Sequence, residues 1–160
     1  GMMKYIVKDF DTRFYAGIEL LGGFKINTDD QKKIPGLWEE FENVYLDDIP
    51  QKKEPLRFIG LEIYRFDFKE TKTVDYYAMV ETDGLIDVEE NLVTKKLPKG
   101  KYIMFPIKKA DITNEIKKVY RYVEKEDINI HLGFHVEDYH VEEESHFNNE
   151  TLYLSFKLEE

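Results

Sequence analysis

One strand-like segment, GFHVEDYHV (133–141), contains two carboxylates, and one of them, Glu137, alternates with aromatic side chains. Alternate residues of an extended chain share a face, so His135, Glu137 and Tyr139 project to one side of this segment. An unpaired carboxylate under rings has a raised pKa and can accept a cation or a proton. Aromatic faces attract cations by about 0.5–2 kcal/mol each. The pattern predicts a site for a small, flat, cationic organic molecule with Glu137 at its floor.

Other β-rich segments supply aromatic side chains that could form the walls of this site. Such faces also carry polar residues, for example Glu62 beside Tyr64, and that mixture is typical of a ligand pocket. The wholly apolar face of TLYLSFKL (151–158) should instead meet the helices, which would leave the mixed faces on the other side of the sheet. The predicted ligand-binding residues are Glu137, Tyr64, Phe66, Tyr102, Tyr139 and Tyr153.

Simpler interpretations of the same residues stay open at this stage. A strand glutamate between an aspartate and hydrophobic residues is often part of a solvated sheet face. Tyrosines at alternate strand positions are often cross-strand packing partners. Trp38 lies on the apolar stripe of a predicted helix, which favours a place in the core.

The histidines suggest a metal site only superficially. Of the four, only His135 projects to the same side as Glu137, and no third ligand is placed with them. The sequence also lacks a phosphate loop, a nucleophile elbow and a zinc-protease signature. We therefore expect neither a metal nor another cofactor.

Composition narrows the class of protein. The 160 residues carry a formal net charge of −10 and no cysteine. A nucleic-acid partner needs clustered Lys and Arg, but here the basic residues are scattered as pairs beside acidic ones, so no direct nucleic-acid binding is expected. No apolar run approaches the roughly 20 residues of a membrane span. We expect a cytoplasmic protein with one domain over 1–160.

The order of predicted elements indicates an α+β fold with an internal repeat. Apolar stripes at helical spacing predict helices at 34–41 and 110–126. Strands are expected at 14–21, 57–68, 74–82, 92–97, 101–109, 133–141 and 151–158, with polar loops after Phe68 and after Val141. The order strand, helix, strand, strand then occurs twice, which predicts two βαββ halves with a ligand cleft at their seam.

Four segments in this order resemble the GyrI-like small-molecule-binding domain, which is also the effector-binding domain of transcription activators of the MerR and AraC types. The matching segments are IPGLWEEF (34–41), FIGLEIY (58–64) with DYYAMVE (75–81), LPKGKYIMF (97–105), and VEDY (136–139) with LYLSFKL (152–158). The resemblance implies a curved antiparallel sheet, two helices on one face and a central aromatic groove. By the VEDY match, it also implies that Glu137 is the groove acid that pairs with lipophilic cations.

Two features depart from the family pattern. Ser155 stands where the family usually has proline, and no helix-turn-helix precedes the domain. We therefore expect a stand-alone copy that does not itself read DNA.

Three functions remain open from the sequence. The first is non-catalytic binding of lipophilic cations, for drug sequestration or sensing. The second is a hydrolase of cyclopropanoid or other electrophilic natural products, with Glu137 as general base and Tyr139 as its partner. The third is a protein-interaction module that inhibits a partner such as DNA gyrase; a homodimer is also possible.

Overall fold

The computed structural model describes residues 2–139 and 150–159. The longer helices are α1 (Lys33–Glu40) and α3 (Ile112–Lys125), and a short helix α2 (Phe68–Thr71) lies between two strands. The strands are β1 (Ile6–Phe10), β2 (Arg13–Glu19), β3 (Phe24–Lys25), β4 (Phe58–Tyr64), β5 (Thr73–Thr82), β6 (Val93–Leu97), β7 (Gly100–Lys108), β8 (Phe134–Asp138) and β9 (Thr151–Lys157).

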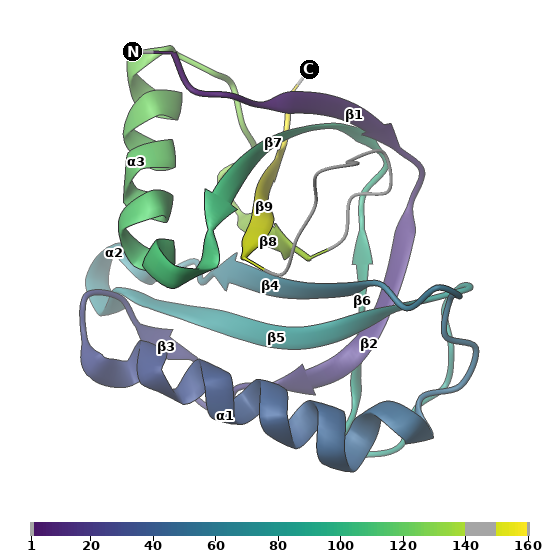
Figure 1. Cartoon of the computed structure of the whole chain (residues 1–160). Helices are drawn as coiled ribbons and strands as arrows, with labels where there is room; N and C mark the ends of the chain where they lie inside the picture. The colour runs from purple at the N-terminus through teal and green to yellow at the C-terminus, as the bar shows by residue number, and fades with distance from the viewer. Residues whose placement is uncertain (1, 140–149, 160) are drawn as a thin grey trace.

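All these strands belong to one antiparallel sheet that curls strongly (Figure 1). The strand order is β1-β7-β9-β8-β4-β5-β2-β6, with β3 paired to β5 outside this path. One half is β2-α1-β4-β5 and the other is β7-α3-β8-β9. The two halves join at the centre of the sheet, where β4 of the first half pairs with β8 of the second. The predicted α+β class, the two βαββ repeats and the curved antiparallel sheet are confirmed.

The two longer helices cover the same face of this sheet. Residue pairs that lie opposite each other across neighbouring strands share a face. From β5 to β9, one such row is Ala78, Gly60, Glu137 and Leu154. Ala78 packs in the core under α1, and Leu154 packs in the core under α3. Figure 1 shows α1 along β5 and α3 beside β7 and β9.

Each helix is held by its apolar stripe. Leu37 of α1 and Val119 and Val123 of α3 are buried against the sheet. After Glu40 the first helix widens into a π-helical turn (Phe41–Tyr45) and then tightens into a 3₁₀ turn (Leu46–Asp48). Such single π turns occur frequently at functional sites, and this one directly follows the turn that carries Trp38. A 3₁₀ turn also precedes each of the two helices, at Asp29–Lys32 before α1 and at Lys109–Asp111 before α3.

Some elements differ from the predicted ones. Strands β1 and β3 were not predicted, and α2 forms within the segment expected to be a polar loop. Strand β1 (IVKDF) has two adjacent charged residues, and β3 has only two residues, so neither shows a clear alternating pattern. The polar loop predicted after Val141 lies outside the described residues. No helix in the described part of the chain is long and apolar enough to cross a membrane.

Candidate functional site

Glu137 lies in β8 at the seam between the two halves. It is 6% exposed, and its cross-strand neighbours are Gly60 in β4 and Leu154 in β9. It therefore lies on the face covered by the helices, between the core under α1 and the core under α3. The prediction that this mixed face would lie away from the helices is wrong. Alternation shows which residues share a face, but not which face the helices cover.

A chain of hydrogen bonds connects α1 to this carboxylate. The Trp38 indole Nε1 donates to the Tyr76 hydroxyl over 2.9 Å, and that hydroxyl donates to Oε1 of Glu137 over 2.8 Å. Gly60 makes room for this contact, because a Cβ there would overlap both the Tyr76 hydroxyl and the Glu137 carboxylate. The absence of a side chain at one β4 position thus permits a tyrosine from β5 to reach a carboxylate in β8.

A second buried network lies two residue pairs further along the same strands. Glu62 of β4 is directly opposite His135 of β8, with Oε2 2.5 Å from the imidazole Nε2. The other ring nitrogen, Nδ1, is 2.6 Å from the Tyr120 hydroxyl of α3, which is in turn 2.7 Å from the Tyr64 hydroxyl. We call Glu62, His135 and Glu137 the acidic seam. All three are buried on the helix-covered face.

Burial dominates the electrostatics of the seam. It raises the pKa of Glu137 to about 7; the Glu62 carboxylate raises it further, whereas His135 and the Tyr76 hydrogen bond lower it. For His135, burial disfavours the charged form, but the Glu62 carboxylate outweighs this effect and raises its pKa above the ordinary value. Burial also raises the pKa of Tyr76 and of Tyr139, so both hydroxyls stay neutral at physiological pH. The seam thus holds a carboxyl that titrates near neutral pH.

Aromatic rings surround the Glu137 end of the seam. Trp38 makes edge contacts with Tyr139 at 5.4 Å and with Phe58 at 6.3 Å between ring centroids. The Lys109 ammonium lies 5.0 Å from the centroid of the Tyr139 ring, on the side of α3, and partial burial lowers the pKa of this lysine. Rings beside a carboxylate can attract a positively charged, flat group, and the Lys109 ammonium already occupies one ring face.

The structure gathers only part of the predicted site. Glu137, Tyr64 and Tyr139 lie on one face, and the neighbouring Glu62 and His135 lie with them. Phe66, just beyond the end of β4, is fully exposed and contributes no wall.

Tyr102 and Tyr153 lie on the opposite face of the sheet. Tyr153 is opposite Asp138, one residue beyond Glu137, and Tyr102 packs with Tyr153 and Met104 in a separate cluster. These two tyrosines therefore cannot share one pocket with Glu137. A shift of one residue in strand register moves a side chain to the other face, and register between distant strands was not available from the sequence.

The sequence interpretation missed Tyr76, which hydrogen-bonds to Glu137, and Trp38, which hydrogen-bonds to Tyr76. Tyr76 is one of two adjacent tyrosines in a strand that is buried from Tyr76 to Thr82, and Trp38 was assigned to the core. The signal that could have found them is chemical, because a buried tyrosine hydroxyl or indole N–H usually needs a hydrogen-bond partner. Among the described residues, no group of three or more His, Asp or Glu side chains is arranged to hold a metal ion.

Comparison with known proteins agrees with this fold. Residues 8–157 match the model of the family Cass2, described as integron-associated effector binding protein. No curated protein sequence matches the chain.

Solved structures share the fold at low sequence identity. An integron cassette protein from the mobile metagenome of Vibrio cholerae has a TM-score of 0.69 at 19% identity, over 97% of this chain and 95% of that one. SAV2435 bound to tetraphenylphosphonium has a TM-score of 0.73 at 17% identity, over 98% and 94%. A bacterial transcription regulation protein from Staphylococcus aureus has a TM-score of 0.68 at 15% identity, over 99% and 100%.

The fold and the family match define an effector-binding domain of the GyrI-like type, a class that binds small molecules. This chain belongs to the Cass2 family of integron-associated effector binding proteins.

Proposed function

We propose that this protein binds small lipophilic cations and that Glu137 neutralises their charge. The observation that carries the proposal is the environment of that carboxylate. It is buried, and no Lys or Arg among residues 2–139 and 150–159 forms an ion pair with it. A buried ionised carboxylate without a counter-charge is costly, so a cation that reaches it gains a strong electrostatic interaction.

The surrounding rings determine which cations bind. Trp38, Phe58 and Tyr139 present edges and faces near the carboxylate, and Tyr76 hydrogen-bonds to it. A delocalised organic cation with aromatic groups can pack against these rings at little desolvation cost, whereas a small, strongly hydrated ion loses its water. The relative SAV2435, with the same fold, was solved with tetraphenylphosphonium bound. That cation combines a positive charge with aromatic rings, which supports the proposal for this chain.

Binding requires local movement of aromatic side chains. Glu137 is covered in this conformation, with Trp38 and Tyr139 packed edge to face next to it. A ligand must displace one of these rings to approach the carboxylate. The π-helical turn at Phe41–Tyr45 begins three residues after Trp38. It is an irregular point at which α1 can shift.

Trp38 provides a built-in probe of this function, since it is the only tryptophan of the 160 residues. Titration with tetraphenylphosphonium should change its fluorescence saturably, with a dissociation constant in the micromolar range. Triphenylphosphine oxide, which is neutral but has similar rings, should bind far more weakly. Equal affinity for the cation and the neutral compound, or no saturable change with either, would refute the proposal.

A further inference from the structure

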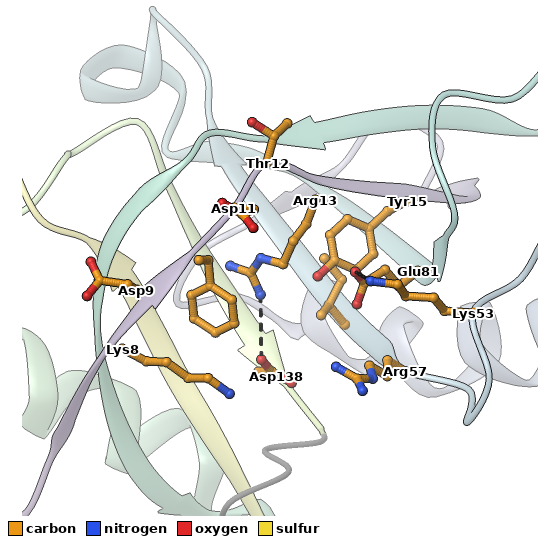
Figure 2. Close-up of a pocket in the computed structure, with 12 residues that line it drawn as sticks. Lys8, Asp9, Asp11, Thr12, Arg13, Tyr15, Lys53, Arg57, Glu81 and Asp138 are labelled. Atoms are coloured by element: carbon orange, nitrogen blue, oxygen red, sulfur yellow. Dashed lines mark hydrogen bonds and ion pairs between the residues drawn. The ribbon is translucent and has the colours of Figure 1, made fainter.

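A separate cavity lies on the opposite face of the sheet, where β1 leads into β2. It encloses about 220 Å³ and is lined mainly by charged side chains, including Lys8, Arg13, Arg57, Glu81 and Asp138. Tyr15 and Ile59 close its inner side and belong to the core on the face away from the helices. The sheet therefore separates this cavity from the acidic seam. Figure 2 shows Arg13 extending from its strand into the space above Asp138.

Arg13 is the unusual residue of this cavity. It is only 8% exposed, and its Nη1 lies 3.9 Å from a carboxylate oxygen of Asp138. Its Nε and Nη2 atoms are buried and make no well-aligned hydrogen bond to the described residues, although the Tyr15 and Tyr102 hydroxyls interact with the guanidinium. These two atoms form one edge of the guanidinium, with two N–H groups pointing in parallel. Buried donors are nearly always satisfied in folded proteins, so this edge lacks the acceptor that its geometry calls for.

Two aromatic rings pack against the guanidinium. Its central carbon lies 3.6 Å from the centroid of the Phe10 ring and 4.9 Å from that of Tyr102. The plane of the donor edge is therefore fixed before any ligand arrives, which reduces the entropy lost on binding. Two parallel N–H donors on a fixed plane match the two oxygens of a carboxylate, which Arg binds in a bidentate manner.

Two of the carboxylates that line the cavity are already paired with lysines. Glu81 is paired with Lys53 at 3.4 Å, and Asp9 is paired with Lys101 at 3.1 Å. Asp138 lies on the Nη1 side of Arg13, away from the edge formed by Nε and Nη2. A dianion would experience repulsion from Asp138 and Glu81, whereas a monoanion adds a single charge next to Arg13.

We infer that this cavity is a second binding site, specific for a small organic carboxylate held by the Nε and Nη2 edge of Arg13. The volume is below the roughly 300–1,000 Å³ of pockets for drug-sized ligands, so the occupant is a compact monocarboxylate. Tyr15 and Ile59 offer an apolar surface for its hydrocarbon part. The site is independent of cation binding at Glu137, because the two lie on opposite faces of the sheet.

Sodium benzoate is a suitable probe, with benzamide as its neutral analogue and inorganic phosphate as a second anion. In ¹⁵N-labelled protein, benzoate should shift the Arg13 side-chain Nε–H resonance and the Tyr15 and Glu81 amides saturably. Benzamide and phosphate should cause at least tenfold weaker effects. Benzamide shifts equal to those of benzoate, or the absence of a saturable shift at Arg13, would overturn the inference.

The substitution Arg13→Lys tests whether benzoate binding needs only the positive charge or also the two parallel donors. Arg13→Lys keeps the charge but loses the paired donor edge, and it should weaken benzoate binding at least tenfold. Its affinity for tetraphenylphosphonium should equal that of the wild type, which also shows that the variant is folded. Undiminished benzoate affinity in Arg13→Lys would contradict the assigned role of the edge. If this variant does not fold, the comparison of benzoate with benzamide in the wild-type protein still decides.

Discussion

The Tyr76 hydroxyl lies 2.8 Å from Oε1 of Glu137 and donates a hydrogen bond to it, while the same hydroxyl accepts one from Trp38. Two aromatic residues of the first βαββ half thus hold the carboxylate of the second half. This relationship links α1, β5 and β8, and it makes the state of Glu137 sensitive to anything that moves Trp38.

Cation affinity should depend on pH through Glu137. Its pKa is raised to about 7 in the folded protein, and a cation binds the ionised form. Affinity for tetraphenylphosphonium should therefore rise about tenfold per pH unit from pH 5 to pH 7 and level off above, with one proton released per ligand. The groups that face Glu137 are Glu62, His135, Tyr76 and Tyr139.

Calorimetric titrations in buffers with different ionisation enthalpies measure this proton release directly. The variant Glu137→Gln should show a much flatter pH profile in the same experiment. A wild-type affinity that does not change between pH 5 and pH 8 would contradict the role of this carboxyl.

The unliganded protein should gain stability when the buried charge is removed. Because the folded pKa of Glu137 is raised from 4.5 to about 7, its contribution is fully favourable below pH 4.5 and is lost as the pH rises through 7. At pH 8, Glu137→Gln should be more stable than the wild type by roughly 3 kcal/mol, since each pKa unit corresponds to about 1.4 kcal/mol. Urea unfolding at pH 8 and at pH 5 tests this, and the difference should shrink strongly at pH 5. A variant that is less stable at both pH values would disprove this stability prediction.

Gly60→Ala should disturb the Tyr76–Glu137 contact, because the added Cβ overlaps the Tyr76 hydroxyl. We expect a loss of about 1–3 kcal/mol in the free energy of unfolding, typical of overpacking. Removing the hydroxyl relieves the closest of these overlaps, although the one with the Glu137 carboxylate stays, so Gly60→Ala should cost less in a Tyr76→Phe background. The four proteins form a double-mutant cycle measured by urea unfolding, and purely additive effects would show that the overlap is unimportant.

Lys109 should act as an internal competitor of the ligand, since its ammonium lies 5.0 Å from the centroid of the Tyr139 ring. Lys109→Met removes this cation and should raise the affinity for tetraphenylphosphonium by about two- to fivefold, the scale of one exposed cation–π contact. The exposed neighbour Lys108, changed to Met, is the matched control and should have little effect. Equal affinities for both variants and the wild type would exclude this competition.

Much of the fold follows from sequence patterns. The apolar stripes of 34–41 and 110–126 correspond to α1 with its following turns and to α3, and the alternating segments correspond to β2 and β4 through β9. These elements have strong periodicity and many apolar residues, so their type is determined locally. The two short strands β1 and β3 depend on pairing with β7 and β5, which no local pattern encodes.

The candidate site was predictable only in part. Glu137 and Tyr139 share a face because they are two residues apart in one strand, which alternation captures. The placement of Tyr102 and Tyr153 depends on the register of β7 and β9 relative to β8, which is a property of the assembled sheet. Tyr76 reaches Glu137 across β4 only because Gly60 has no side chain, a relationship among three strands that no single segment reveals.

The most direct test of the central claim compares Glu137→Gln with Glu81→Gln by isothermal titration with tetraphenylphosphonium at pH 8. Glu81 is also a buried strand glutamate, but it lies on the opposite face and is paired with Lys53. Glu137→Gln should weaken cation binding by about 2–5 kcal/mol, the cost of breaking a buried charge pair, which is roughly 30-fold or more. Glu81→Gln should bind as the wild type does. Equal affinities in the two variants would show that the cation is not neutralised at Glu137.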